Sequence, residues 1–489
     1  MTAAPGLEDV GDVEVRNHND IEAQKHKQQP AKHWQLVFDQ THVTPEVLNH
    51  RYPGSGTHDD PYVVEYIHND RRNPMLFPMW KKWAITILVA FATLAVAFVS
   101  AAYTGGVTQI IEEFNVSDEV VTLGVSLFVL GFAIGPLLWA PFSEIYGRQI
   151  LFFGTYAMLT FFNAGAAGSQ NIQTLLILRF FAGAFGSSPL TNAGGVIADI
   201  FPASQRGIAM SVFAAAPFLG PTIGPIVGGF LAETEGWRWV EGLMAIFTGA
   251  LWIMGALLIP ETYSPVILRR RAKKLSQMTG KVYKSRMEVE KGEKSLRSEL
   301  KTAVSRPWIL LFREPIVLLL SIYMAIIYGT LYMMFAAFPI VYQQNRGWSE
   351  GIGGLAFIGV AVGMMGAVAY TIPDNNRYNR VAEKNGGNAP PEARLPPSML
   401  GSVFLPLGLF WFAWTNSPSI HWSVSIIGTA PFGFGMVLVF LSIMNYLIDA
   451  YTIYAASVLA ANSVLRSLFG AIFPLFTTCK SLFLLHIVT

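Results

Sequence analysis

Charged residues are scarce in this chain of 489 residues. Asp, Glu, Lys and Arg together make up 13% of it, whereas 52% of the residues are hydrophobic and the mean hydropathy is +0.41. An average soluble domain contains about 25% charged residues. This shortage excludes an ordinary soluble enzyme and indicates a membrane protein.

Two further shortages narrow the class of protein. The 34 Lys and Arg residues exceed the 32 Asp and Glu residues by a net charge of only +2, which gives no footprint for nucleic acid. The single cysteine, Cys479, cannot form an internal disulfide and is no metal or redox signature. The sequence shows no nucleophile triad, phosphate loop or metal-ligand set. We therefore expect a protein that is not an enzyme and that binds no metal or cofactor.

The first 82 residues lack any long apolar run. Such a segment buries too little apolar surface to offset the entropy of ordering its chain. We therefore expect a mostly disordered cytoplasmic tail over residues 1–82.

From Trp83 onward, apolar stretches recur at about the 20 residues that a helix needs to cross a bilayer. Eleven spans are predicted, at 84–103, 120–139, 149–168, 173–197, 207–231, 239–260, 315–338, 351–371, 398–415, 421–446 and 453–478. After Lys480 only nine residues remain. As a helix they would rise about 14 Å, against a hydrocarbon core of about 30 Å, so no twelfth span is expected.

The distribution of Lys and Arg between the loops predicts the orientation of the chain. The loop 104–119 contains neither residue, whereas the long connection 261–313 is basic and includes the run 269–274. Cytoplasmic loops collect Lys and Arg, so we expect the amino terminus in the cytoplasm. The run 269–274 either binds anionic lipid headgroups or only sets this topology.

The predicted spans fall into two groups. Residues 83–260 contain six spans, the basic loop 261–313 follows, and residues 314–489 contain five. This organisation predicts an all-α membrane protein of two pseudo-symmetric six-helix halves, with the last helix of the second half missing. Transporters built from paired repeats bind substrate near the midplane between the repeats, so the organisation alone favours a transporter.

Ionisable residues inside the hydrocarbon are costly, and each is a functional candidate. Arg179 in the fourth span and Arg466 in the eleventh are the charges that we place far from a helix end, while Asp199 and Asp449 lie at cytoplasmic ends. A guanidinium cannot release its proton, so Arg179 is expected to tune a nearby acid, to bind an anionic group, or to act as a structural hub. The first span contains no carboxylate.

Glycines repeat every four residues in two of the predicted spans. They are Gly220, Gly224 and Gly228 in the fifth span and Gly359 and Gly363 in the eighth. This spacing lets two helices approach closely, so we expect the two rows to pack against each other. Pro221 and Pro225 remove backbone donors and kink the fifth span.

The loop between the second and third spans carries an acid and a base separated by a glycine. Glu144 precedes Arg148 by four residues, with Gly147 between them. The pair predicts a charge-assisted lock at the membrane face that opens with helix movement. The alternative is a static surface salt bridge.

Taken in order, these features resemble the major facilitator superfamily, and within it the fungal drug:proton antiporters of the twelve-span type. The resemblance runs from about residue 63 to residue 478. It is carried by Glu144, Gly147 and Arg148, by Arg179, by the segment 220–229, by 258–265 with Arg269, Arg270 and Arg271, and by the segment 462–470.

The resemblance implies a rocker-switch exporter in which two halves alternate about a central cavity and inward proton flow drives substrate out. Its implied proton-coupling and gating residues are Arg179, Glu144, Gly147, Arg148, Asp199, Arg206 and Arg466. An antiporter also needs a proton carrier, and because the first span has no carboxylate, Asp199 and Asp449 are the candidates that are left. Its implied gate seal against the eighth span comprises Gly220, Gly224, Pro225, Gly228 and Gly229. Its implied cavity residues are Tyr103, Ser187, Ser188, Asn192, Tyr323, Tyr328, Tyr332 and Asn462. Ordinary helix packing is the alternative for the tyrosines.

The implied substrates are hydrophobic or amphipathic drugs, toxins or secondary metabolites, which suit a cavity of apolar and aromatic side chains. The expected partners are the substrate, protons and the bilayer, with a monomeric carrier in the plasma membrane. The sequon Asn115-Val116-Ser117 on an outer loop predicts glycosylation at Asn115. Two alternatives stay open: a nutrient importer of the same superfamily, and a truncated carrier or sensor that transports nothing.

Overall fold

The structure is a computed structural model that describes residues 33–41, 43–292, 296–386, 389–451 and 454–488. Within these residues, eleven helices are long and apolar enough to cross a membrane, the number that the sequence predicts. The helices of the first half are α4 (Met79–Ala102), α6 (Asp118–Tyr146), α7 (Arg148–Ala167), α8 (Ile172–Ile200), α9 (Ala203–Glu235) and α10 (Trp237–Leu258). Those of the second half are α14 (Pro315–Phe338), α16 (Phe357–Lys384), α17 (Pro396–Thr415), α18 (Trp422–Ala450) and α19 (Ala455–Val488).

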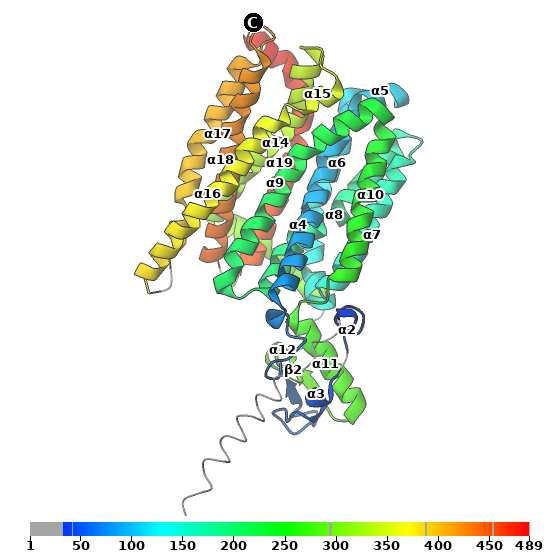
Figure 1. Cartoon of the computed structure of the whole chain (residues 1–489), viewed down its shortest axis with the longest axis vertical. Coiled ribbons are helices and arrows are strands. Elements are labelled where there is room, and N and C mark those ends of the chain that lie inside the picture. The colour runs from blue at the N-terminus through cyan, green and yellow to red at the C-terminus, as the bar shows by residue number, and fades with distance from the viewer. Residues whose placement is uncertain (1–32, 42, 293–295, 387–388, 452–453, 489) are drawn as a thin grey trace, which may run out of the picture.

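Short helical segments extend three of these spans at one end of the bundle. The helix α4 continues through η2 (Tyr103–Gly106) into α5 (Val107–Phe114), η3 (Pro339–Gln344) follows α14, and α15 (Glu350–Gly354) precedes α16. Figure 1 shows α5 and α15 at the same end of the molecule. The side chains of this end therefore come from both halves of the chain.

The two groups of spans form two side-by-side bundles (Figure 1). Helices α4, α6, α7, α8 and α10 pack with one another, and α14 and α16–α19 form the second bundle. The bundles meet where α9 contacts α15 and α16 and where α6 contacts α19. A continuous cluster of buried apolar residues runs through both bundles and the interface between them.

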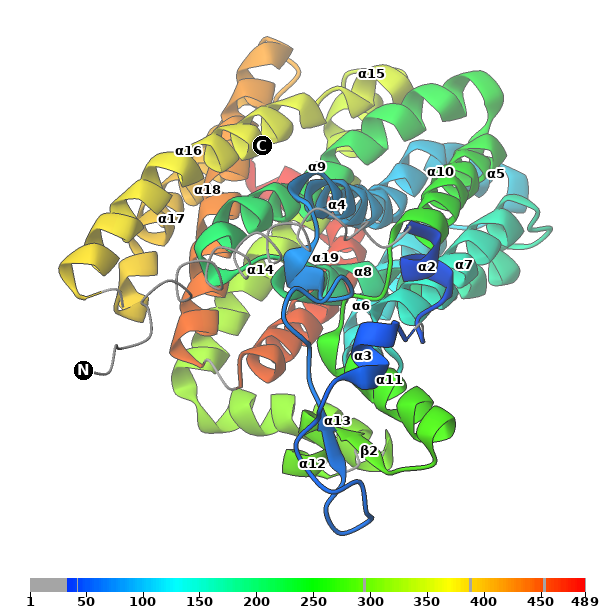
Figure 2. The same cartoon turned by 60° about the horizontal axis from the view of Figure 1, so that its bottom comes forward.

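A small subdomain covers the opposite end of the bundle (Figure 2). It combines α2 (His33–Phe38), α3 (Pro45–Asn49), β1 (Tyr62–Val64) and η1 (Pro74–Leu76) with α11 (Ser264–Thr279), β2 (Tyr283–Ser285) and α12 (Arg286–Lys291), and α13 (Leu296–Arg313) leads from it to α14. The strands β1 and β2 pair in parallel, with Val63 opposite Lys284. Apart from this two-stranded sheet, the described fold is helical.

The predicted disorder of the 1–82 tail is wrong for residues 33–41 and 43–82, while residues 1–32 and 42 lie outside the described residues. Apolar side chains that are scattered along the tail gain their burial from the loop 261–313. The resulting small core consists of Val47, Tyr52, Val64, Ala272 and Leu275. The sequence pattern hid this core because its two sides are separated by the first six spans.

A buried ion pair fastens the tail to α11. The Nη2 atom of Arg271 lies 3.1 Å from Oδ1 of Asp70, Nη1 pairs with Oδ2, and the two side chains are 5% and 4% exposed. Arg72 donates to the backbone oxygens of Gln35 and Asp39, at 3.1 Å and 2.6 Å. Burial, and then the neighbouring charge of Arg271, lower the pKa of Arg72 to about 10, so Arg72 stays charged at neutral pH.

Candidate functional site

Arg179 forms a buried ion pair with a residue that the sequence analysis missed. Its Nη1 atom lies 3.0 Å from Oε1 of Glu241 on α10, and both side chains are 1% exposed. Its Nε donates to the backbone oxygen of Gly124 at 2.9 Å and its Nη2 to that of Val99 at 3.3 Å. The guanidinium lies 4.1 Å from the ring centre of Tyr103. Arg179 therefore joins α8 to α4, α6 and α10.

Glu241 escaped notice because it lies in the first turns of α10, where a charge normally reaches the interface. The spacing of its apolar neighbours along the helix nevertheless indicates that Glu241 is buried. Trp237, Val240 and Met244 are buried and share one face of α10 at helical spacing, and Glu241 lies on that face. Its Oε2 is buried and has no hydrogen-bond partner among the described residues. The pair thus presents a carboxylate oxygen that can take a proton beside a guanidinium that cannot lose one.

Arg148 is fixed at the end of the bundle that faces the tail subdomain. Its Nε lies 3.4 Å from Oδ2 of Asp199, and its Nη1 bonds to Ser143 and Asn192. Its backbone nitrogen donates to Oε1 of Glu261 at 2.9 Å. Glu261 thus places a carboxylate at the amino-terminal end of α7, where the free N–H groups and the helix dipole favour an anion.

The structure pairs Arg148 with Asp199 from α8, and the Glu144–Arg148 lock stays a prediction. Gly147 is the reason for the pairing with Asp199: its φ of +103° turns the chain sharply between α6 and α7 and directs the arginine to α8. A methyl group at Gly147 would lie 2.0 Å from Oε2 of Glu261. Glu144 lines a pocket together with Arg269 from α11.

Arg206 lies near this network without joining the Arg148–Asp199 pair. Its Nη2 donates to the backbone oxygens of Ala198 at 3.2 Å and Phe201 at 3.5 Å, at the end of α8 where carbonyls lack a partner within the helix. The role that the structure supports is therefore to hold the turn between α8 and α9.

The basic run 269–274 binds protein groups at three of its positions. Arg269 and Arg270 donate to the backbone oxygens of Ile145 and Tyr146 at the end of α6, and Arg271 pairs with Asp70. The remaining two lysines of the run are exposed. Lipid binding by this run stays a prediction, and the lysines are the residues most accessible for it.

The glycine row of α9 packs within its own half. A methyl group at Gly220 would lie 2.6 Å from the backbone oxygen of Leu94, and one at Gly228 would lie 2.2 Å from that of Ala102. Gly224 meets α4 in the same way, 2.8 Å from the nitrogen of Ala102. These three glycines therefore set the distance between α4 and α9.

The predicted packing of this row against Gly359 and Gly363 is wrong. Those two glycines face α18, where a methyl group would lie 2.1 Å from the oxygen of Ile426 and 1.9 Å from that of Ala430. Equal spacing in two helices shows that each has a close neighbour, and it does not show which neighbour.

The other face of α9 meets the second half. A methyl group at Gly354 of α15 would lie 2.5 Å from the backbone oxygen of Pro225, and one at Gly229 would lie 2.5 Å from that of Glu350. The segment 220–229 thus contacts α15 through Pro225 and Gly229, and α15 forms the start of the eighth span. The two faces of the segment 220–229 join α4 to the opposite half.

Polar bonds join the halves at the same end. Gln109 of α5 lies 3.4 Å from Oε2 of Glu350, and the backbone nitrogen of Gly351 donates to Oε2 of Glu233 at 3.1 Å. Gln109 also donates to the backbone oxygen of Ala232 at 2.7 Å. The end that carries α5 and α15 is therefore closed between the two halves in this structure.

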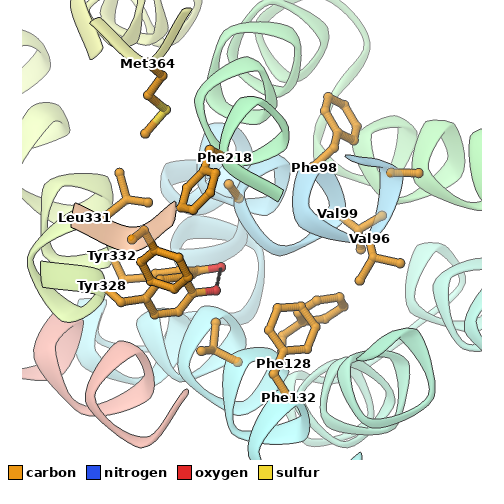
Figure 3. Packing of buried hydrophobic residues seen from close by; sticks show 14 of the residues in the cluster. Val96, Phe98, Val99, Phe128, Phe132, Phe218, Tyr328, Leu331, Tyr332 and Met364 are labelled. Carbon is orange, nitrogen blue, oxygen red and sulfur yellow. Dashed lines mark hydrogen bonds between the residues drawn. The ribbon is translucent and has the colours of Figure 1, made fainter. Parts of the chain in front are cut away.

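The halves also touch at the centre. Ser100 of α4 and Tyr332 of α14 share a hydrogen bond of 2.9 Å, and the hydroxyl of Tyr328 lies 3.4 Å from that of Tyr332. Phe218 of α9 meets Phe440 of α18 edge-on, with ring centres 5.0 Å apart. Figure 3 shows the two tyrosines with their hydroxyl groups together and Phe218 beside them.

Arg466 of α19 lies against this centre. Its guanidinium carbon is 4.9 Å from the ring centres of both Tyr328 and Phe440. One turn earlier, Asn462 donates to Ser321 at 3.4 Å and contacts the sulfur of Met324 at 3.3 Å. Of the predicted cavity residues, Tyr328, Tyr332 and Asn462 are therefore the ones that gather near the interface.

The other predicted cavity residues lie elsewhere. Tyr103 is buried inside the first half, where its hydroxyl donates to the backbone oxygen of Val121 at 3.1 Å. Ser187 bonds within α8, and Ser188 and Asn192 line a small cavity with Arg148. Tyr323 precedes Tyr328 by five positions and so falls on a different face of α14.

Asn115 is exposed at the end of α5 and adopts a positive φ of 50°. This position leaves its side chain accessible. Glycosylation there remains a prediction.

Two helical halves that meet around a polar and aromatic centre define a secondary carrier. Residues 89–474 match the Major Facilitator Superfamily, and the chain belongs to this superfamily. The structure is similar to the xylose transporter XylE from E. coli in its partially occluded inward-open conformation. The TM-score is 0.58 at 16% identity, covering 81% of this chain and 92% of that one. The predicted family and two-half fold are confirmed.

Curated fungal relatives are much closer in sequence. The chain is 67% identical to the MFS-type efflux pump MFS2 of Trichophyton rubrum, over 94% of this chain and 77% of that protein. It is 65% identical to the multidrug transporter mdrA of Aspergillus fumigatus, over 92% of this chain and 74% of that protein.

Proposed function

We propose that this protein exports hydrophobic or amphipathic small molecules by alternating access and that proton entry drives the export. The observation that carries the proposal is the 67% identity to a fungal efflux pump, which extends over 94% of the chain. A second relative, at 65% identity, is a multidrug transporter. The likeness to the xylose transporter, at 16% identity, concerns the fold and gives no support to nutrient import.

The contacts between the halves supply the moving parts of this mechanism. The bonds from Gln109 to Glu350 and from Glu233 to Gly351 join the halves at one end, and Ser100 bonds to Tyr332 at the centre. Opening toward the α5 and α15 end has to break these few polar bonds. The Arg148 network lies within the first half, so that half moves as one body with its tail subdomain.

For the proton step, the pair Arg179–Glu241 is the strongest candidate. With Glu241 ionised, the buried pair is neutral overall. Proton uptake at Glu241 leaves the guanidinium of Arg179 as an uncompensated buried charge, which is costly away from water. A conformation that gives Arg179 another partner is then favoured, and this preference couples protonation to movement.

The distribution of charge between the two ends of the bundle supports an orientation of the carrier in the membrane. The basic segment 269–274 and the tail lie at one end of the bundle, whereas α5 and α15, with Glu112, Glu113 and Glu350, lie at the other (Figure 1). Under the positive-inside rule, the tail end faces the cytoplasm. We place the carrier in the plasma membrane as a monomer, with Asn115 on the outer side and accessible to glycosylation.

The test is export by the full chain expressed in a drug-sensitive yeast. Accumulation of several hydrophobic compounds is measured with and without a proton uncoupler, against cells that carry an empty vector. We expect accumulation below the vector control for at least one compound, and recovery when the uncoupler is added. Equal accumulation for every compound, despite delivery to the cell surface, would instead support the carrier or sensor that transports nothing.

A further inference from the structure

Arg466 is a charge in the middle of a membrane span, and it has no acidic partner in the part of the chain that the structure describes. Among the described residues, no ion pair joins its guanidinium to a carboxylate, and its Nε is buried without a hydrogen-bond partner. Its nearest aromatic neighbours come from two other helices, Tyr328 on α14 and Phe440 on α18.

Arg179 provides a comparison, because its contacts within the protein account for its burial. It has an acidic partner, two backbone oxygens and two aromatic faces, and it is fully enclosed. Within the described residues, the contacts of Arg466 are two aromatic faces alone. A charge at this depth without a counter-ion costs several kcal/mol, and proteins keep such groups where they act on a ligand or an ion.

The surroundings of Arg466 fit a ligand of mixed character. The ring of Phe440 packs against that of Phe218 from the first half. These two rings form an aromatic wall that crosses the interface between the halves. Beside it lie the joined hydroxyls of Tyr328 and Tyr332, with Tyr332 also bonded to Ser100. Two further buried polar atoms on the same helix, Oδ1 of Asn462 and Oγ of Ser467, have no partner among the described residues.

We propose that Arg466 anchors a substrate site between the halves that selects amphipathic molecules with one carboxylate or similar anionic group on a ring-containing apolar body. This inference rests on the proposed export function and names its substrate class. The guanidinium pairs with the anion through two parallel N–H···O bonds, and the aromatic wall covers the body of the substrate. Cations are disfavoured, because Arg466 repels them and no described carboxylate pairs with it there.

This geometry also predicts that lysine is a poor replacement. An ammonium keeps the charge of Arg466 but loses the planar fork and the stacking on Tyr328 and Phe440. A hydrogen bond to a charged group is worth about 1.5–3 kcal/mol, so loss of the anchor lowers affinity for an anion about 10- to 100-fold.

The binding test uses the purified full chain and a matched pair of probes, 2-naphthoate and 2-naphthamide, which share a ring system and differ in charge. Equilibrium dialysis is expected to show that the wild type binds the naphthoate at least about tenfold more tightly. Arg466→Gln is expected to remove this preference while leaving naphthamide binding within about threefold, and Arg466→Lys to retain a part of it. Arg380→Gln, which changes an exposed arginine at the end of α16, is the control and keeps the full preference.

Two results overturn the inference: equal affinity of the wild type for both probes, or an unchanged preference in Arg466→Gln. The first needs no variant, so it stands even if Arg466→Gln fails to fold. Export from yeast separates the inference from the proposed function. Uncoupler-sensitive export of neutral compounds without naphthoate selectivity refutes the site alone. Naphthoate binding through Arg466 without export of any compound refutes the export function and retains the site.

Discussion

Glu241 and Arg179 lie 3.0 Å apart on α10 and α8, and each side chain is 1% exposed. One carboxylate oxygen, Oε1, accepts from the guanidinium, while the other, Oε2, is buried without a partner among the described residues. The pair is therefore tightly held on one side and able to take a proton on the other. Its two members should respond differently to substitution.

Glu241→Gln is expected to abolish uncoupler-sensitive export while the protein still exchanges substrate across the membrane. Glutamine keeps an oxygen for Arg179 and cannot bind and release a proton near neutral pH. The measurement is active efflux together with substrate counterflow, which needs no proton gradient. The control is Glu235→Gln, an exposed acid two residues before α10. Normal proton-driven efflux by Glu241→Gln would exclude this carboxyl as the carrier.

The cost of separating the pair gives a second prediction. Arg179→Met alone leaves Glu241 as a buried charge without its partner, which typically costs about 3–5 kcal/mol. The double change Arg179→Met with Glu241→Met removes both charges and is expected to cost less than either single change. Thermal unfolding in detergent provides the measurement. Equal and additive losses from the two single changes would mean that the ion pair contributes little.

Gly228 and Gly154 form a matched pair for testing the glycine contact with α4. A methyl group at Gly228 would lie 2.2 Å from the backbone oxygen of Ala102, whereas one at Gly154 on α7 meets nothing within 4 Å. Gly228→Ala is expected to destabilise the protein by about 1–3 kcal/mol, because the backbones have to separate. Gly154→Ala should leave the unfolding temperature unchanged or slightly higher. A similar effect of both changes would contradict the close approach of α4 and α9.

The tail subdomain depends on the buried pair Asp70–Arg271. Asp70→Asn is expected to release residues 43–78 from α11, since it leaves Arg271 buried without its acid, a loss of about 3–5 kcal/mol. Limited proteolysis and hydrogen exchange of this segment provide the measurement. The control is Glu65→Gln, which breaks the exposed pair with Arg286, where the side chains are 53% and 63% exposed and solvent screening leaves little to lose. Protection that survives Asp70→Asn would show that the apolar contacts alone hold the tail.

The sequence predicts the number of spans, the two-half fold and the family because these depend on long apolar runs and on short motifs in order. Partners that are distant in the sequence could not be predicted in the same way. Arg148 carries a strong local signal, yet its acid, Asp199, lies 51 positions away and reaches it only through the turn at Gly147. The glycine rows of α9 and α16 predict that each helix has a close neighbour, but they do not identify it. In the structure each row faces a helix of its own half, α4 for α9 and α18 for α16.

The small core of the tail is the clearest example of packing that the local sequence pattern does not predict. Val47 and Val64 belong to short apolar stretches in a polar segment, and their burial is completed by Ala272 and Leu275 from the far side of six spans. A window of consecutive residues cannot contain both sides of such a core. The burial of Glu241, by contrast, could have been predicted from the sequence, because helical spacing places it on the buried face of α10.

The closed end between the halves gives the last prediction. Gln109 and Glu350 come from α5 and α15 and lie 3.4 Å apart at their side-chain ends. With Cys479 replaced by serine, cysteines at positions 109 and 350 are expected to react with a short bifunctional thiol reagent and to join the two halves. Export should then stop, because alternating access requires this end to open, and a cleavable linker should restore export after reduction. Each single-cysteine variant is the control and should export normally. Full export by the cross-linked protein would mean that this end does not open during transport.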